Sequence, residues 1–410
     1  MADRTIAWKA DTENATGPLV GLKVLDIANF LAGPISAMFL ADLGADVIKL
    51  EKPGTGDEAR GWGNAKNGVG LMYKLINRNK RSVEADLRTP LGQEIVKRLV
   101  RDADLVVENY RKGKIEEWGI GYDTLSAINP GIVMMSITGF GHTGPHANRP
   151  GFGTLAEGYS GYAYITGWPD RPPLLPSFGL ADDTAGLTAA YLALAALRQR
   201  DRTGKGQRVE FALYEPLFTL LGPQVVDYDQ LGRVQERNGS RLPFTAPRNT
   251  YRCKDDRWVS IAGSAQTTFE RMCQALGLAH LITDPRFIDN RLRIQNAVAL
   301  DEALQAAIEQ YDRDDLVTLF TKVDATVAPC HSIKDIFEDE HYQARGNIAS
   351  VEDEELGGPI RMQNVIGRFS DSNPRIRHAG PRLGSSNRQV LVEMLGFSAA
   401  DLTAAGYKLD

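Results

Sequence analysis

The sequence predicts an α/β protein, with a Rossmann-like open parallel sheet in a large domain and a smaller α+β domain. Residues 23–137 alternate short β-rich, apolar runs with segments of helical periodicity, which is typical of a parallel sheet covered by helices. A mostly polar run at 229–241 then has the composition of a linker, and two short β-rich runs follow it. These changes along the 410 residues predict more than one domain.

The large domain is expected to contain several alternations of strand and helix. Thr89 and Pro90 suit the cap and the first position of one helix, and the dense glycines and prolines of 139–176 predict loop-rich structure. A turn at 203–207 precedes the last strand. In chain order we expect strand 23–27, helix 34–43, strand 47–50, helix 90–101, strands 105–107 and 132–135, helix 182–200 and strand 208–212.

The smaller domain is expected to begin with a hairpin. Strands at 249–253 and 258–261 flank a charged turn, and helical patterns follow at 267–276 and 299–311. The predicted domain boundaries are 1–222 for the first part of the large domain, 223–325 for a linker and the small domain, and 326–410 for a second linker and the C-terminal return to the large domain.

Composition argues against several partners and compartments. The 47 basic and 52 acidic residues are spread along the chain and give a net charge of −5, so we expect no nucleic-acid partner. The most apolar stretch, 185–197, is too short to span a bilayer, so we expect no membrane partner. Residues 1–6 (MADRTI) lack the pattern of a signal peptide, and three scattered cysteines suit a cytoplasmic protein.

Motifs for metal and nucleotide binding are absent. His142 and His146 stand four residues apart, but Gly144 and Pro145 between them disfavour a helical ligand pair, so no metal site is expected. The segment 28–34 (ANFLAGP) lacks the glycine patterns of dinucleotide and P-loop sites. This segment either only connects a strand to a helix, or forms a helix N-terminus whose backbone amides bind a pyrophosphate or a thioester oxygen.

Carboxylates are the remaining class of candidate nucleophile. No G-x-S-x-G elbow is present, and the neighbours Cys330 and His331 would point in different directions on a strand. Asp182 and Asp183 open the long helix, and carboxylates can act as covalent nucleophiles. Aspartate is also a favoured helix cap whose charge complements the helix dipole, so composition and spacing alone favour the capping role.

Longer strings of the sequence carry a family resemblance. They are 21–26 (GLKVLD), 32–34 (AGP), 43–51 (LGADVIKLE), 77–82 (NRNKRS), 108–110 (ENY), 139–145 (GFGHTGP) and 203–207 (TGKGQ). In this order they resemble the class III CoA-transferases, the family of the formyl-CoA and carnitine CoA-transferases. The resemblance implies a homodimer of interlocked rings. It also implies coenzyme A or an acyl-CoA as substrate, a carboxylic acid as second substrate, and no permanently bound cofactor.

The resemblance also implies site residues. The family's catalytic aspartate opens the helix after the loop-rich segment, and its register within 179–186 (GLADDTAG) selects Asp182. Asp183 is the competing choice. Because successive helix residues point about 100° apart, only one of the two aspartates can face the thioester. Amides of residues 31–35 are candidates for stabilising an oxyanion. The family's contacts to CoA fall on Phe30, Leu31, Lys52, Ala85, Arg88, Asn109 and Tyr110, with Lys114 as a candidate for a phosphate.

Two departures from the family pattern bear on the reaction. Phe152 occupies the position of the histidine in related racemases, and a phenylalanine cannot exchange a proton, so α-proton chemistry is disfavoured. The segment 242–248 (LPFTAPR) replaces a glycine-rich flap, which disfavours an oxalate-type acceptor.

Arginines near the replaced flap bear on the acceptor. Because arginine suits a second carboxylate, Arg237, Arg241 and Arg248 favour a dicarboxylic acceptor with succinyl-CoA as donor, although a surface position explains them equally well. An acyl-CoA racemase and a non-catalytic CoA-binding protein stay open as alternatives.

Overall fold

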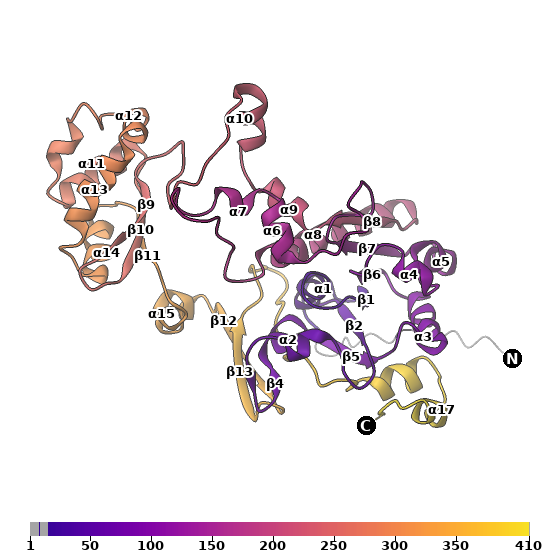
Figure 1. The fold of residues 1–410 in the computed structure, drawn as a ribbon. Coiled ribbons are helices and arrows are strands. Elements are labelled where there is room, and N and C mark those ends of the chain that lie inside the picture. Colours follow the sequence, from indigo (N-terminus) through magenta and orange to yellow (C-terminus); the bar gives the residue numbers. More distant parts are fainter. Residues whose placement is uncertain (1–7, 9–14, 410) are drawn as a thin grey trace. The chain divides into compact units, whose positions relative to one another are not determined.

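The computed structural model describes residue 8 and residues 15–409 (Figure 1). Residues 1–6, on which the expectation about a signal peptide depends, lie outside the described residues. The chain divides into two compact units. The first consists of the described residues of Met1–Tyr162, Leu175–Pro223 and Ala344–Asp410, and the second of Ala163–Leu174 and Gln224–Gln343.

A six-stranded parallel sheet forms the centre of the first unit, which confirms the predicted α/β class. Its order is β5-β2-β1-β6-β7-β8, so the chain adds strands first on one side of β1 and later on the other. The winding therefore changes direction between β1 and β6, the position where open sheets of this kind bind ligands. The strands are β1 (Lys23–Asp26), β2 (Asp46–Glu51), β5 (Lys80–Glu84), β6 (Leu105–Glu108), β7 (Val133–Thr138) and β8 (Arg208–Ala212).

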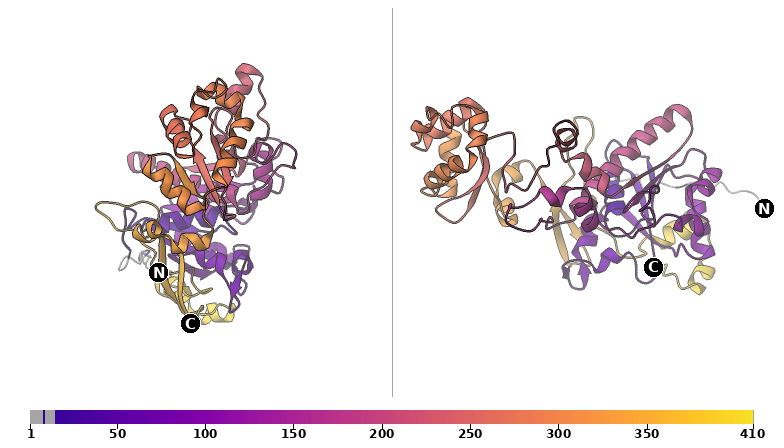
Figure 2. Two further views of the ribbon diagram at one scale, coloured as in Figure 1. Left: turned by 90° about the vertical axis from the view of Figure 1, so that its left-hand side faces the viewer. Right: turned by 45° about the horizontal axis from the view of Figure 1, so that its top comes forward.

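Both faces of this sheet are buried, so successive side chains of one strand enter two different cores. Leu25 and Ile48 pack with α3, α5 and the C-terminal helices, whereas Val24 and Val47 pack with α1 and α8. The C-terminal segment, yellow in Figures 1 and 2, lies beside α3. These helices are α1 (Ala32–Asp42), α3 (Pro90–Val100), α5 (Tyr122–Ile128), α8 (Leu180–Thr203), the π-helix η3 (Arg388–Met394) and α17 (Ala399–Ala404).

Strand β5 is missing from the sequence-based prediction. Its residues, KRSVE, have the composition of an exposed segment, yet all of them are buried. Lys80 Nζ lies 2.9 Å from Asp26 Oδ2, and Arg81 Nη2 lies 2.5 Å from Asp46 Oδ2. Buried charges need such partners, and here the partners lie far away in the sequence, on β1 and β2. The local pattern of hydrophobic residues therefore carries no sign of this strand.

The segment predicted to be loop-rich contains a short helix, α6 (Gly153–Tyr159), which packs beside the start of α8. Glycines at both positions 153 and 158 conceal it from a prediction based on helix propensity. The remaining elements of the first unit are η1 (Glu58–Gly61), β3 (Ala65–Lys66), β4 (Val69–Gly70), α2 (Leu71–Ile76), α4 (Lys114–Glu117), α9 (Tyr214–Thr219), β12 (Ile348–Asp353) and β13 (Gly358–Gln363).

The second unit is built on a three-stranded antiparallel sheet in the order β11-β10-β9. The predicted hairpin is confirmed at β9 (Arg248–Arg252) and β10 (Trp258–Ala262), and the predicted helices at α11 (Gln266–Ala275) and α13 (Ala297–Ile308). The other elements from residue 162 onward are α7 (Tyr162–Ile165), α10 (Gln224–Leu231), η2 (Ala279–Ile282), α12 (Asn290–Gln295), α14 (Arg313–Lys322), β11 (Val327–Pro329), α15 (Ile333–Glu338) and α16 (Glu340–Ala344).

A search of the described residues finds no helix with both the length and the apolar character needed to cross a bilayer.

Candidate active site

A cavity of about 290 Å³ lies at the carboxyl edge of the parallel sheet. Its walls come from the loops that follow β1 (residues 29–32), β6 (109–112) and β7 (139–152), together with Leu213 after β8 and Asp182 on α8. The cavity therefore lies at the point where the winding of the sheet changes direction, and the diverging loops after β1 and β6 leave room for a ligand there.

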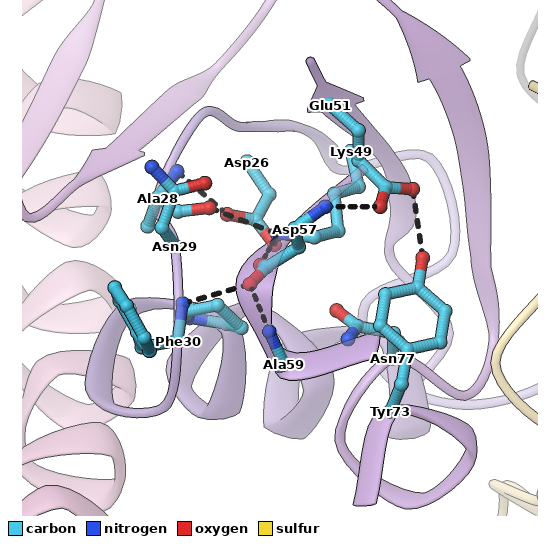
Figure 3. A network of polar contacts seen from close by, with 12 residues as sticks. Asp26, Ala28, Asn29, Phe30, Lys49, Glu51, Asp57, Ala59, Tyr73 and Asn77 are labelled. Carbon is cyan, nitrogen blue, oxygen red and sulfur yellow. Dashed lines mark hydrogen bonds and ion pairs between the residues drawn. The ribbon is translucent and has the colours of Figure 1, made fainter. Parts of the chain in front are cut away.

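A buried polar network holds the turn after β1 (Figure 3). Asp26 accepts the Ala28 amide at 3.0 Å, and Asp57 accepts the Phe30 amide at 3.0 Å. Lys49 Nζ donates to the Ala28 carbonyl oxygen at 2.8 Å and pairs with Asp57 at 2.8 Å. Phe30 has φ of 60°, a conformation that costs a non-glycine residue of the order of 1 kcal/mol. Fixed side-chain partners on both flanks hold the turn in this conformation.

The loops after β1 and β6 are joined by side chains at the floor of the cavity. Asn109 accepts the Asn29 amide at 2.9 Å and donates to the Asn29 carbonyl oxygen at 2.7 Å. The Asn29 side chain donates to the Tyr110 hydroxyl at 2.9 Å. Two of the predicted CoA contacts, Asn109 and Tyr110, thus line the cavity and also fix the geometry of its neighbouring loop.

Small residues bring α8 close enough for its first turn to reach the cavity. A Cβ on Gly186 would overlap the side chain of Ile35 on α1, and Ala185 and Ala189 are buried along the same helix. Because α1 and α8 pack this closely, the N-terminus of α8 lies beside the turn that begins α1. Leu31, at the N-cap of α1, lies within 3.3 Å of the position that a Cβ on Gly179 would take.

Asp182 faces the cavity, whereas Asp183 is exposed and is not part of the cavity lining. Asp182 has no hydrogen-bond partner among residues 8 and 15–409, and Gly179 is the N-cap of the helix. The capping role that composition and spacing favour for this aspartate is therefore wrong. Burial raises the pKa of Asp182 to about 7, with further contributions from the negative charges of Asp183 and Glu157.

The predicted oxyanion donors need a correction. Pro34 has no amide hydrogen, and the Ile35 amide donates to the Leu31 carbonyl oxygen at 2.8 Å. The first-turn amides of Ala32 and Gly33 have no acceptor within the helix, as at any helix N-terminus, and they begin the helix that borders the cavity. The candidate donors are thus confined to residues 31–33.

Half of the predicted CoA contacts line the cavity. Phe30, Leu31, Asn109 and Tyr110 do so, whereas Lys52, Ala85, Arg88 and Lys114 do not. Lys52 and Ala85 directly follow the carboxyl ends of β2 and β5, so they lie along the same edge of the sheet as the cavity.

Two of the three predicted cations that do not line the cavity are paired with carboxylates. Arg88 is exposed and pairs with Asp86 at 2.7 Å, and Lys114 is exposed and pairs with Glu117 at 2.8 Å. Exposed pairs of this kind are weak, so they leave either side chain free to exchange partners.

Three cations of the cavity were missed by the sequence analysis: Arg111, Lys112 and Arg149. The first two directly follow the predicted contacts Asn109 and Tyr110. Their position just beyond a buried strand could have identified them, because loops at the carboxyl ends of parallel strands form the binding site in such folds.

The three arginines proposed for a second carboxylate belong to the second unit and contact residues of that unit. Arg237 donates to the Tyr164 carbonyl oxygen at 2.9 Å, and Arg241 pairs with Asp301 at 2.6 Å. Arg248 donates to the Ser240 carbonyl oxygen. In this structure their guanidinium groups stabilise the second unit itself.

Aromatic rings form an apolar wall of the site. The ring centroid of Phe30 lies 5.2 Å from that of Trp62 and 6.1 Å from that of Phe152. Phe152 is 56% exposed and lines the cavity with Asp182, so an apolar ring stands where a proton-exchanging group would be needed for α-proton chemistry. In the part of the chain that the structure describes, no group of three or more His, Cys, Asp or Glu residues could hold a metal ion.

Known proteins resemble this chain over nearly its whole length. Residues 19–387 match the family model for CoA-transferase family III. Succinyl-CoA–D-citramalate CoA-transferase of Chloroflexus aurantiacus is 41% identical over 94% of this chain and 96% of that protein. Succinate–glutarate CoA-transferase of Agrobacterium fabrum is 34% identical over 94% of this chain and 97% of that protein.

A solved structure agrees with these similarities. The crystal structure of a CAIB/BAIF family protein from Brucella suis covers 92% of this chain and 100% of its own, with a TM-score of 0.82 and 36% identity. Sequence motifs, fold and site geometry lead to one conclusion: the chain belongs to CoA-transferase family III.

Proposed function

We propose that the protein transfers coenzyme A from succinyl-CoA to a small dicarboxylic acid through a covalent intermediate on Asp182. Relatives with 34–41% identity are named for succinyl-CoA or succinate together with D-citramalate, L-malate or glutarate, all of which are dicarboxylic acids. The observation that carries the proposal is the Asp182 carboxylate, which lines the cavity without any hydrogen bond among the described residues. Such a group keeps its lone pairs available for attack on a thioester.

The reaction follows from this nucleophile. A carboxylate oxygen of Asp182 attacks the thioester carbon of succinyl-CoA, and departure of CoA thiolate from the tetrahedral intermediate leaves a mixed anhydride of Asp182 and succinate. The thiolate then attacks the aspartyl carbonyl carbon, so that succinate leaves and an aspartyl-CoA thioester remains. The acceptor carboxylate repeats these steps in reverse: it displaces CoA thiolate to form a second anhydride, and the thiolate takes the acceptor acyl group and releases the Asp182 carboxylate.

Coenzyme A is proposed to lie along the carboxyl edge of the sheet. A cavity of about 290 Å³ holds the thioester end and the acyl group, whereas a nucleotide needs the further edge where Lys52, Ala85 and Arg88 follow β2 and β5. Arg111, Lys112 and Arg149 add positive charge to the cavity, which favours a dicarboxylate and the phosphates of CoA. These three cations replace Arg237, Arg241 and Arg248 as candidates for the second carboxylate.

The active form is proposed to be a homodimer of interlocked rings. Support comes from α10, which has no buried residue and exposes Val226 (62%), Tyr228 (61%) and Leu231 (72%). Several large apolar side chains exposed together on one helix are unusual on a monomer and are typical of a covered surface. Light scattering with size-exclusion chromatography tests this, and a monomer at micromolar concentration would contradict it.

A racemase is the alternative within the family's chemistry, and Phe152 at the cavity counts against it because its ring cannot carry a proton. Incubation of an α-chiral acyl-CoA in deuterated water without an acceptor acid separates the two activities. Deuterium at the α-carbon would support the racemase.

The decisive experiment combines turnover with trapping. Purified protein is incubated with succinyl-CoA and, in turn, D-citramalate, L-malate, glutarate and monocarboxylic acids, and new thioesters are measured by mass spectrometry. Hydroxylamine then traps the aspartyl thioester. We expect the dicarboxylates to be preferred and the label to fall on Asp182. Asp182→Asn should lose activity by about 10³-fold or more, whereas Asp183→Asn should keep it within about tenfold. A label elsewhere, or a protein that binds CoA without transfer, would refute the proposal.

A further inference from the structure

The proposed role of Asp182 as nucleophile does not explain which group accepts the backbone amides at the start of α8. The first amides of a helix have no acceptor within the helix, and the side chain of the N-cap residue usually accepts one of them. Asp182 is in that first turn but accepts none among the described residues, and Gly179 at the N-cap has no side chain to do so. The Leu180 amide donates to the Phe178 carbonyl oxygen at 2.8 Å, so it is the Ala181 amide that needs an acceptor group from another element.

Glu157 is that group. Its side chain is on α6, only 3% of the residue is exposed, and Oε1 accepts the Ala181 amide at 3.3 Å. Burial raises the pKa of this carboxyl, and the neighbouring Ala181 and Leu180 amides oppose the rise. Both amides belong to the first residues of α8, directly before Asp182.

The same helix contacts Asp182 a second time. Gly153 is one helical turn before Glu157, and a Cβ at this position would overlap Oδ2 of Asp182. Residues four apart lie on one face of a helix, so a single face of α6 both satisfies the backbone before Asp182 and leaves space for its carboxylate.

We propose that Glu157 is a positioning residue for Asp182: its buried carboxylate accepts the Ala181 amide in the first turn of α8, and so holds that turn with the nucleophile facing the cavity. This inference rests on the proposed function of Asp182. Glu157 itself does not line the cavity, so it acts through α8 and makes no contact with substrate there.

The charge of Glu157 adds an electrostatic effect. Burial raises the pKa of Asp182. The negative charges of two neighbouring carboxylates, Asp183 on the same helix and Glu157 on α6, raise it further. The cations of the cavity, Arg111, Lys112 and Arg149, line the same space. A more basic carboxylate is a stronger nucleophile once it is ionised, so Glu157 shifts the pH range of the reaction as well as its geometry.

Two variants separate these roles. Glu157→Gln keeps an acceptor oxygen for the Ala181 amide but removes the charge, and we expect kcat at pH 8 to stay within about fivefold while the acidic limb of kcat/KM moves to lower pH. Glu157→Ala removes the acceptor as well. We expect kcat and the rate of hydroxylamine labelling at Asp182 to fall together by more than about tenfold, with KM for succinyl-CoA changed by less than about threefold.

Asp289→Asn is the matched control. Asp289 accepts the Leu292 amide at 2.7 Å at the N-terminus of α12, in the second unit, so this variant also neutralises a carboxylate at a helix start. Its pH profile should match that of the unaltered protein. If Glu157→Ala keeps its rate within about twofold, or if the Gln variant shows no shift of the limb, the inference is overturned.

A measurement made without substrate tests this inference separately from the proposed function. Carbon-13 NMR of labelled aspartate follows the titration of the Asp182 carboxyl, assigned with Asp182→Asn. A lower midpoint in Glu157→Gln than in the unaltered protein supports the inference even if no CoA transfer is found. An unchanged midpoint overturns it even if transfer and labelling at Asp182 are found.

Discussion

The carboxylate of Asp182 lies directly against the backbone of Gly153, so that a side chain at residue 153 would occupy the space of Oδ2. Gly153 does not have a positive φ, and its role is therefore to permit a close approach and not a special backbone conformation. The Asp182 carboxylate therefore has its space only because residue 153 of α6 carries no side chain.

Replacing Gly153 by alanine should displace the Asp182 carboxylate. A shift of about 1 Å in a reacting group can cost about 10²-fold in rate, so we expect Gly153→Ala to lower kcat by roughly that factor. Gly158→Ala is the control, because it adds the same methyl group to the same helix where no atom lies within 4 Å. It should keep activity, and alanine should stabilise the helix by about 0.5–1 kcal/mol. Equal rates in the two variants would contradict the prediction.

The pH dependence of the reaction should report Asp182. Its pKa is raised to about 7 by burial and by two neighbouring carboxylates, and only the ionised form attacks. We expect kcat/KM to rise tenfold per pH unit below about 7 and to level off above it. Because Asp183 also raises this pKa, Asp183→Asn should move the limb to lower pH. A limb that stays near pH 4 in the unaltered protein would show that Asp182 is not the group that titrates.

The same carboxylate should limit the stability of the fold. The pKa of Asp182 is higher in the folded state than in the unfolded state, where it is near 3.8, so the folded state binds more protons between these values. The free energy of unfolding therefore falls as the pH rises from about 4 through about 7. Asp182→Asn removes this effect and should be more stabilising at pH 8 than at pH 5 by on the order of 2 kcal/mol, measured by urea denaturation at both values.

Replacing two nearby lysines, Lys112 and Lys114, should change the KM for succinyl-CoA to different extents. Lys112 lines the cavity, whereas Lys114 lies outside it and pairs with Glu117. We expect Lys112→Ala to raise KM for succinyl-CoA by about threefold to tenfold, with a smaller effect at high salt because exposed charges are screened. Lys114→Ala should change KM by less than about twofold. The reverse order would show that CoA lies along α4 and not across the cavity.

The sequence by itself determined the class of the fold and, through the family resemblance, the candidate nucleophile. The apolar residues of β1 and β2 include adjacent pairs, Val24 with Leu25 and Val47 with Ile48, which face opposite sides of the sheet, and this pattern is typical of a parallel sheet covered by helices. The resemblance carried by the longer motifs selected Asp182, at the start of a helix, as the candidate nucleophile, and assigned Phe30 and Leu31 to CoA binding. These features are local in the sequence, so a single chain is enough to recognise them.

Tertiary structure decided which groups meet. Strand β5 is recognisable only once Lys80 is placed against Asp26, and Asp182 is separated from Asp183 only once the direction of each side chain is fixed by the packing of α8 on α1. Glu157 gives no local sign of its proposed role, because the Ala181 amide that it accepts belongs to a different helix. Burial, charge pairing and side-chain direction depend on residues far apart in the chain, and only folding brings those residues together.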